Sequence, residues 1–521
     1  STVEFIGKDA FYNTPISSLT FESNSHLKVI EQSAFENTKE LDSVILPASL
    51  TQMGTAVFRN SGITSVTFAN GIGLTEIANN AFAYTQLTSV KIPNTVTKVG
   101  DGAFRNCQNL ETFNYGDQEL WLGANAFYDS GLTFFHISEN LHVIEEFALA
   151  SLNELTAFTV DENNQYYTEV DGMILRKDGK KLITAPAGMQ GDLVIPQSVE
   201  ILGYGSFEST ELSSVTFPTE GNILCIANRA FFGAENIREI TIPQSVVSID
   251  YYAFAYAKNL EKLTFEDGSR LTGIYEGAFI GCSKLSDILL PDTVVEISDF
   301  AFYGCESITE LPISENSGLK GIYSHAFAYT GLTELVLPEG IVDIDDYSFM
   351  GTDLTKVVIS NASEKELRIG IGAFESCNVL EYIELPFIGA SYEDYEISWF
   401  GYIFGAGKSY ASQAYIPASL KTVKINGSIT FIGNEAFYEV TSIDKLELPG
   451  TVDTLYGNAF CNSDIAYEIV NPVYLRQDHY VTETIARREY FGFGIAGNLQ
   501  LSSGILEIAN SAFYECDNLA S

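Results

Sequence analysis

The stretch LTSVKIPNTVTKVGDGAFRNC at residues 87–107 decides the fold, because the same pattern returns as LSDILLPDTVVEISDFAFYGC at residues 285–305. Self-similarity at a fixed step indicates an architecture of stacked repeats. An Ala-Phe pair or a close variant marks each unit, and successive phenylalanines lie 22 to 25 residues apart in the regular stretches. Leu149 takes the phenylalanine position in one unit and Phe404 is a weaker candidate in another, which gives about nineteen units. The phenylalanines, called the repeat phenylalanines below, are Phe11, Phe35, Phe58, Phe82, Phe104, Phe127, Phe207, Phe231, Phe254, Phe279, Phe302, Phe327, Phe349, Phe374, Phe437, Phe460 and Phe513.

Each unit predicts two short strands followed by a turn. At the end of residues 87–92 apolar and polar positions alternate, as in a strand with one buried face. Pro93 follows, and because proline has no N–H to donate, it ends the pairing at the same height in each coil. Residues 294–297 offer a second inward pair, and residues 298–302 predict a single helical or 3₁₀ turn that points Phe302 inward.

Stacking of the units predicts the architecture of the whole chain. A unit of about 23 residues cannot bury its apolar face alone, whereas stacked neighbours build one continuous core. Strands of successive units then pair in parallel, about 4.8 Å apart. The sequence therefore predicts a single β-rich solenoid over residues 1–521, with a parallel sheet on its concave face and short 3₁₀ turns on its convex side. Insertions are expected near 161–191, 387–416 and 464–500, and two Asp-Gly turns in the first predict β-hairpins.

The position three residues after each repeat phenylalanine is almost always small, and five of the seven cysteines lie there. Inside a stacked coil a free cysteine behaves as a compact hydrophobe. No C-x-x-C pair occurs, so we expect these thiols to be structural rather than metal-binding or redox-active. The five are Cys107, Cys282, Cys305, Cys377 and Cys516.

Composition limits the classes of partner. The chain has 28 Lys+Arg against 68 Asp+Glu, a formal net charge of −40, although only 18 % of its residues are charged. Such a charge opposes binding to phosphate backbones and to anionic lipid, so nucleic acid is excluded as a partner. No run of 18 apolar residues and no signal peptide occurs, which indicates no direct membrane insertion in this segment.

The repeat unit resembles the BspA-like, treponemal-type leucine-rich repeat family, through the pattern Leu-x-x-Ile-x-Leu-Pro-x-x-Val-x-x-Ile-x-x-x-Ala-Phe-x-x-Cys. Residues 171–188 and 401–420 are similar to two further segments that recur in that family. The resemblance covers nearly the whole chain. It implies a right-handed leucine-rich-repeat superhelix, a bacterial surface location, and a role in adhesion and protein binding.

The second insertion is the first candidate binding surface, because it is rich in aromatic residues. Its candidates are Tyr392, Tyr395, Trp399 and Tyr402. Insertions of solenoids often lie on the binding face, and aromatic side chains dominate protein contacts. Two interpretations stay open: the rings fill a widened coil, or they contact a partner. The third insertion contains a basic cluster at residues 487–488.

The outward positions of the strands are the second candidate surface. Solenoids bind partners along such extended faces, although exposed strand positions are polar in any case. One column of these positions is small and hydroxylated in its early part, at Ser43, Ser65, Ser89 and Thr112. Its later part is charged and mixed, and its candidate binding residues are Glu239, Lys262, Asp287, Glu310, Glu334, Lys356 and Tyr382.

Two motifs resemble nucleotide-binding or phosphate-binding motifs, but the sequence around them lacks what those motifs require. Residues 492–497 match G-x-G-x-x-G, but no βαβ unit surrounds them. Residues 405–409 resemble a phosphate loop, but Tyr402 stands where its first glycine is required. No Ser/His/Asp order or paired carboxylate stands out. The sequence predicts no enzyme, no cofactor and no metal site.

These observations together predict a non-catalytic, secreted or surface-displayed protein. The predicted function is adhesion or binding to host or neighbouring-cell proteins. A glycan ligand bound by the aromatic insertion and a purely architectural spacer are the alternatives. The chain begins and ends within a repeat, so we expect an export signal and an anchor to lie outside it.

Overall fold

The computed structural model describes residues 2–470, apart from 219–220, 361–364, 393, 395–396, 453, 456–458, 461–462 and 464, together with strands at 484–485 and 507–508. The chain packs as two compact units. The N-terminal unit comprises Ser1–Val246 and Ala253–Lys258, and the C-terminal unit comprises Val247–Tyr252 and Asn259–Ser521. The described residues of both units form coils of a parallel β-solenoid with little helix, as the repeat predicted.

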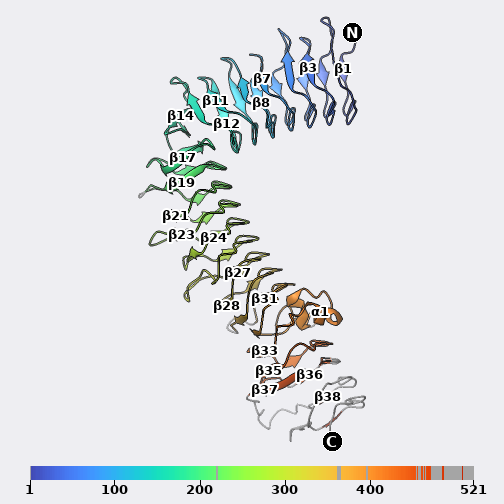
Figure 1. Cartoon of the computed structure of the whole chain (residues 1–521), viewed down its shortest axis with the longest axis vertical. Coiled ribbons are helices and arrows are strands. Elements are labelled where there is room, and N and C mark those ends of the chain that lie inside the picture. The colour runs from blue at the N-terminus through green and yellow to red at the C-terminus, as the bar shows by residue number, and fades with distance from the viewer. Residues whose placement is uncertain are drawn as a thin grey trace. The chain divides into compact units, whose positions relative to one another are not determined.

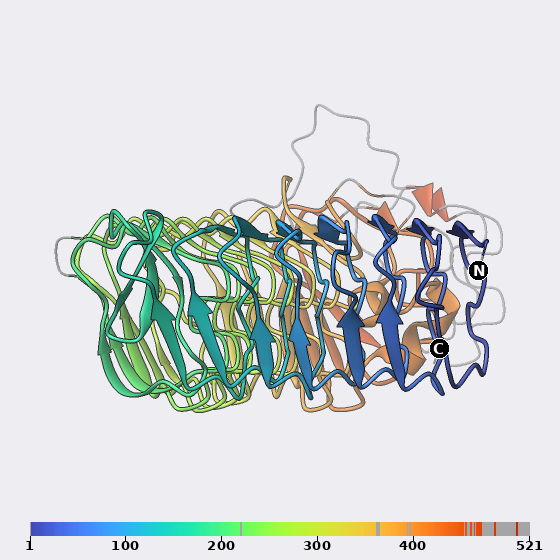
Figure 2. The same cartoon turned by 90° about the horizontal axis from the view of Figure 1, so that it is seen from above.

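Most coils of the N-terminal unit contribute a strand to one or both of two ladders, a long-strand ladder and a short-strand ladder (Figure 1). Strands of consecutive coils pair in parallel, and Figure 2 shows the blue strands of the first coils pointing the same way. The long strands are β3 (Ser43–Leu46), β5 (Ser65–Phe68), β7 (Ser89–Lys91), β9 (Thr112–Asn114), β11 (Phe134–Ile137), β13 (Ala157–Val160), β17 (Gln190–Val194), β19 (Glu211–Thr216) and β21 (Glu239–Ile242). The short strands are β1 (Phe5–Ile6), β2 (Val29–Ile30), β4 (Gln52–Met53), β6 (Glu76–Ile77), β8 (Lys98–Val99), β10 (Leu120–Leu122), β12 (Leu141–Ile144), β18 (Ile201–Leu202) and β20 (Cys225–Ile226).

The C-terminal unit repeats this plan with the same two kinds of strand. Its long strands are β23 (Lys262–Phe265), β25 (Asp287–Ile288), β28 (Glu334–Leu337), β30 (Lys356–Ile359), β32 (Tyr382–Leu385), β33 (Thr422–Ile425), β35 (Lys445–Pro449) and β37 (Ala466–Val470). Its short strands are β22 (Ser248–Ile249), β24 (Gly273–Ile274), β26 (Glu296–Ile297), β27 (Gly321–Ile322), β29 (Asp343–Ile344), β31 (Arg368–Ile369), β34 (Phe431–Ile432) and β36 (Thr454–Leu455). The pair β38 (Thr484–Ile485) and β39 (Glu507–Ile508) is also parallel.

The turn of each coil is built from successive hydrogen-bonded turns. The amides of Ala34 and Glu36 bond three residues back within the coil, whereas the amide of Phe35 donates to Val57 O in the next coil at 2.9 Å. Ser33 and Asn37 have φ of +54° and +61°. These left-handed residues keep the i→i+3 bonding from continuing as a 3₁₀ helix, so it stays confined to single turns.

The repeat phenylalanines form an aromatic stack. Within each unit, most consecutive rings lie 5.0 to 5.8 Å apart and within 11° of parallel. Offset stacking of this kind adds to the burial energy of the rings. In the N-terminal unit the stack pauses between Phe127 and Phe207, where Leu149 occupies the position and is 3 % exposed.

Where the small position after a repeat phenylalanine is a buried threonine, its hydroxyl caps the carbonyl of that phenylalanine. Thr38 Oγ1 donates to Phe35 O at 2.8 Å. Cys107 reaches instead to the preceding coil, and its Sγ donates to Phe82 O at 3.1 Å. The described cysteines at this position are all buried, as expected, and burial raises the pKa of the Cys107 thiol to about 11. Cys516 lies outside the described residues.

The first insertion contains the predicted hairpins. Strand β14 (Tyr167–Val170) pairs antiparallel with β15 (Met173–Arg176), which pairs antiparallel with β16 (Lys181–Thr184). Asp171 and Gly172 at the first turn have φ of +50° and +83°, as the type I′ turn requires.

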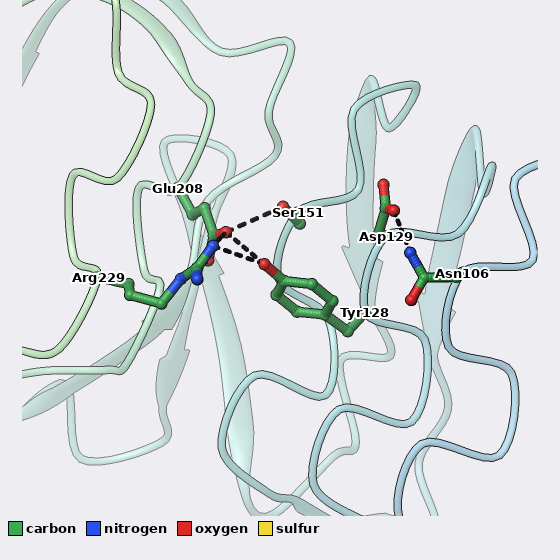
Figure 3. Close-up of polar contacts among 6 residues, drawn as sticks. All are labelled: Asn106, Tyr128, Asp129, Ser151, Glu208 and Arg229. Atoms are coloured by element: carbon green, nitrogen blue, oxygen red, sulfur yellow. Dashed lines mark hydrogen bonds and ion pairs between the residues drawn. The ribbon is translucent and has the colours of Figure 1, made fainter. Parts of the chain in front are cut away.

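A cluster of polar side chains bridges the same interruption (Figure 3). The Glu208 side chain is fully buried and accepts hydrogen bonds from Tyr128 at 2.8 Å and Ser151 at 3.0 Å. Arg229 forms an ion pair with the same carboxylate and donates to the Tyr128 hydroxyl at 2.6 Å. The cluster thus joins coils on both sides of the insertion by partly buried polar contacts around one fully buried carboxylate.

The second insertion forms the helical segments η1 (Phe400–Phe404), η2 (Ser409–Ala411) and α1 (Ser412–Tyr415). Here one position of the phenylalanine stack is divided between two rings. The Phe374 amide donates to the carbonyl of Ile403, so Phe404 takes the next stack position after Phe374. The Phe400 amide donates to the carbonyl of Ala436, so Phe400 takes the stack position before Phe437. The third insertion begins with β37, which continues the long-strand ladder beside β35, and its basic cluster at 487–488 lies outside the described residues.

Candidate functional site

The long-strand face carries the predicted column of outward residues. Ser43, Ser65, Ser89 and Thr112 are directly opposite one another in the N-terminal unit. In the C-terminal unit the register places Glu334 beside Lys356, and Lys356 beside Tyr382.

The remaining members of the charged part of the column, apart from Glu310, also begin strands. Glu239 is the first residue of β21, Lys262 of β23 and Asp287 of β25. Lys262 and Asp287 form an ion pair of 2.7 Å between half-exposed and exposed side chains. The predicted outward placement is therefore right for these residues, and their binding role stays a prediction.

Glu310 departs from the column, because its coil has no strand at this position. Pro312 follows two residues later, in the place of an outward strand residue, and its ring nitrogen has no hydrogen to donate to the ladder. The structure accordingly has no strand between β25 and β28 in the long-strand ladder. The expectation that Glu310 lies on a strand is wrong for this reason.

Pro312 also reverses the burial of its neighbours. Pro312 itself is buried, whereas Leu311 and Ile313, which the repeat would bury fully, are only partly buried. The Pro312 carbonyl accepts a hydrogen bond from Leu290 N at 2.8 Å, which holds the proline against the preceding coil. The two aliphatic side chains therefore face the hollow that the missing strand leaves.

This hollow, called the Pro312 hollow, is open and has a volume of about 690 Å³. Val336, Leu337, Pro338 and Val358 of the next two coils add to its apolar lining, and Val336 is 58 % exposed. Carboxylates supply much of its polar lining, from Glu315, Glu339 and Glu384. It therefore combines an apolar floor with an acidic rim.

The Glu384 end of the hollow is held by three donors. Lys424 Nζ lies 2.8 Å, Tyr382 Oη 2.9 Å and Asn426 Nδ2 3.1 Å from the carboxylate oxygens. Burial alone would raise the pKa of Glu384, but these hydrogen bonds and the charge of Lys424 hold it below its usual value. Burial, together with Glu384, raises the pKa of Tyr382 to about 12. Glu384 thus contributes a fixed carboxylate to the polar lining of the hollow.

A second open hollow, of about 630 Å³, lies beside β23 and β25. Leu289, which is 61 % exposed, lies on its floor, and Asp267 and Asp292 are among its carboxylates. Ser314 lines both hollows and donates to Asp292 Oδ1 at 2.5 Å. The two hollows are therefore neighbours on the long-strand face of the C-terminal unit.

The aromatic residues of the second insertion make internal contacts. The Tyr392 hydroxyl donates to Ser428 O at 3.1 Å, and Trp399 Nε1 donates to Ala406 O at 2.8 Å. Trp399 meets Tyr402 edge-on at 6.1 Å, and both side chains are half-buried. Tyr395 lies outside the described residues. These contacts support the interpretation that the rings fill a widened coil.

The repeat itself identifies the family. A sequence model described as "BspA type Leucine rich repeat region (6 copies)" matches residues 1–74, 75–170, 190–288, 272–395 and 408–477. The chain belongs to the BspA-type leucine-rich repeat family. The stretches left unmatched before residue 477, 171–189 and 396–407, fall within the first two insertions of this BspA-type chain.

Three solved structures are similar to this BspA-type chain over more than half of its length. A leucine-rich repeat protein from Eubacterium ventriosum is 20 % identical over 61 % of this chain and 83 % of its own, with a TM-score of 0.45. A leucine-rich cell surface protein from Faecalibacterium prausnitzii is 22 % identical over 60 % of this chain and 90 % of its own, with a TM-score of 0.44. The pneumococcal vaccine antigen PcpA is 16 % identical over 90 % of this chain and 85 % of its own, with a TM-score of 0.38. A search of curated proteins gives no significant match.

Two further features of this BspA-type chain concern metals and membranes. Among the described residues, no group of three His, Cys, Asp or Glu side chains is placed to hold a metal ion. In the same part of the chain, no helix combines the length and the apolar character needed to cross a membrane.

Sequence reasoning missed the apolar lining of the Pro312 hollow in this BspA-type chain. The signal was present in the sequence, because Pro312 stands two positions earlier in its unit than Pro291 does in the preceding one. A proline inside a strand pattern argues against that strand. The exposure of Leu311 and Ile313 follows from this displacement.

Proposed function

We propose that this chain is a non-catalytic binding protein, secreted or displayed outside the cell, that holds a protein partner on its long-strand face. The observation that carries the proposal is that large aliphatic side chains on this face remain in water, Leu289 at 61 % and Val336 at 58 % exposure. Apolar patches rimmed by polar residues mark interaction sites. Membership of the BspA-type family supports this use, because solenoids offer extended faces to partners.

The partner that we propose is a protein of a host or neighbouring cell. The outward column of the C-terminal unit carries charges of both signs, with Glu334 beside Lys356. A mixed pattern of this kind selects a partner with the complementary pattern. The formal net charge of −40 disfavours partners whose surface is a phosphate backbone.

A charge swap on the column tests the proposal. Exchanging Glu334→Lys together with Lys356→Glu keeps the net charge but reverses the local pattern. The matched control is Glu235→Lys with Lys258→Glu, which exchanges an exposed ion pair of 2.8 Å outside the column. Binding of purified protein to extracellular-matrix proteins and to whole cells is measured by surface capture and flow cytometry.

We expect the column swap to weaken binding about tenfold, through one or two misplaced charges, and the control swap to bind as the wild type does. Equal binding by both swaps would place the partner on another surface. Native protein found only in the cytoplasm would refute display outside the cell.

A carbohydrate ligand is the second candidate. The observation that favours it is the exposure of two rings in the second insertion, Tyr410 at 64 % and Tyr415 at 45 %. Binding to a glycan array that is lost in Tyr410→Ala or in Trp399→Ala would support this function. Binding to matrix proteins alone would argue against it.

A further inference from the structure

We propose that the Pro312 hollow and the hollow beside it receive a basic, extended segment of the partner that presents apolar side chains. The proposal rests on the function proposed above and adds the chemistry of the bound segment. It is argued from the lining of the hollows, from their charge and from the residue that opens them.

The apolar floor is a consequence of Pro312 and not of chance exposure. In a regular coil of this chain the outward positions alternate with inward aliphatic residues, as in β28, where Leu335 and Leu337 are buried. At Pro312 this alternation is reversed, so Leu311 and Ile313 join the outward Val336. Aliphatic side chains from two successive coils therefore meet on one exposed surface, which suits apolar side chains of a partner.

The rim sets the sign of the charge that fits. Glu315 and Glu339 line the Pro312 hollow, and Asp267 and Asp292 line its neighbour. The described residues that line the two hollows include no lysine and no arginine. A clefted surface lined by one sign of charge concentrates ligands of the opposite sign. In the partner segment, lysine or arginine side chains would therefore pair with the acidic rim, and an apolar side chain between them would pack on the floor.

The occupant is a segment of another protein, and the charges argue against the competing occupants. A second copy of this chain would bring 68 acidic residues against 28 basic ones to a face that is already acidic. A nucleic acid would bring phosphates to the same carboxylates. An extended peptide fits because Ser314 belongs to both hollows, so that successive apolar side chains of one strand-like segment would reach both floors.

The test uses the whole chain and three fluorescent heptapeptides, with binding followed by fluorescence polarisation at low and at physiological salt. The first peptide alternates lysine and leucine, the second has serine in place of leucine, and the third has glutamate in place of lysine. We expect binding of the first peptide only, with an affinity that falls as salt rises. Equal binding of the lysine–serine peptide would overturn the role of the floor, and binding of the glutamate–leucine peptide would overturn the role of the rim.

Variants then locate the peptide. Val336→Ser changes an exposed side chain, so it should leave the fold intact and weaken binding about fivefold. Glu315→Gln with Glu339→Gln should weaken binding and flatten its salt dependence. The matched controls are Val295→Ser, which is 39 % exposed and outside both hollows, and Glu306→Gln with Glu366→Gln, which also lie outside them. Unchanged affinity in the hollow variants would refute the site.

The two proposals fail in different ways. If the hollow variants bind the lysine–leucine peptide less well but capture matrix proteins and cells as the wild type does, the partner does not use the hollows, while the long-strand face can still be its site. If the Glu334/Lys356 swap leaves capture of those proteins and cells unchanged, the proposed function fails whatever the peptide does.

Discussion

Replacing Arg229 by alanine gives a sharp test of how the N-terminal unit holds together across its first insertion. Arg229 pairs with Glu208, donates to the Tyr128 hydroxyl at 2.6 Å and lies 3.7 Å from the centre of the Phe232 ring. The Glu208 side chain is fully buried, so the substitution leaves a buried carboxylate with only the Tyr128 and Ser151 hydroxyls as donors among its described partners. Breaking a buried pair in this way costs about 3–5 kcal/mol.

The double variant Glu208→Gln with Arg229→Met separates charge from packing. If the cost of Arg229→Ala comes from an uncompensated charge, removing both charges should restore all but about 1–2 kcal/mol. The control is Lys258→Ala, which breaks an ion pair of 2.8 Å between half-exposed side chains of the same unit. An exposed pair is worth about 0–1 kcal/mol, so this variant should unfold almost as the wild type does.

Urea unfolding followed by tryptophan fluorescence measures these differences for one unit alone. The chain has two tryptophans, Trp121 in the N-terminal unit and Trp399 in the C-terminal unit. In a Trp399→Phe background the emission reports only the surroundings of Trp121. A loss below about 1 kcal/mol in Arg229→Ala, the range of an exposed pair, would refute the reasoning. So would a double variant as unstable as the single one.

Three further outcomes follow from the repeat itself, each measured by the same urea titration. Phe82→Ala removes a fully buried ring from the middle of a stack and should cost about 3–5 kcal/mol; a loss near 1 kcal/mol, the size of an ordinary surface change, would mean that the stack relaxes around the gap. Thr38→Val deletes the hydroxyl that caps Phe35 O and should cost about 1 kcal/mol, whereas Ser61→Ala should be neutral or stabilising, because the buried Ser61 hydroxyl has no partner among the described residues; the reverse order would contradict the capping role. The folded pKa of Cys107 is raised from 9.0 to about 11 by burial, so its stabilising contribution is complete below pH 9 and is lost as the pH rises through 11. The unfolding midpoint should therefore fall more steeply above pH 9 in the wild type than in Cys107→Thr, and parallel pH profiles would exclude this thiol as the cause.

Much of the fold could be predicted because each unit repeats the same physical instruction. A phenylalanine every 22 to 25 residues predicts one stack of buried rings, and the alternation of apolar and polar residues before each proline predicts a strand with one buried face. The register of Ser43, Ser65, Ser89 and Thr112 follows without further information. Two Asp-Gly turns likewise identified the hairpins of the first insertion. At the first turn both Asp171 and Gly172 have a positive φ, which few other residues accept, and at the second turn Gly179 does.

The candidate site was less predictable, because it arises where a unit departs from the pattern. Reading outward residues as a column placed Glu310 on a strand that Pro312 prevents. The same reading could not find Val336 and Leu311 together, since one is outward and the other inward in a regular coil. Contacts between distant coils were also out of reach. Tyr128 and Arg229 are 101 positions apart in the sequence, and the intervening insertion brings them together.

The division of one stack position between Phe400 and Phe404 shows how a solenoid can accept an insertion. Phe404 completes the preceding coil and Phe400 begins the bonding to the following one, and the two rings meet edge-on at 5.4 Å. The segment that continues beyond Phe404, through η2 and α1, therefore leaves and rejoins the solenoid without shifting the register of the coils on either side. The segment between Phe404 and β33 is therefore a suitable place to insert foreign sequence. We expect that loops of other lengths, exchanged between Phe404 and β33, would alter what the molecule displays while the scaffold beneath stays the same.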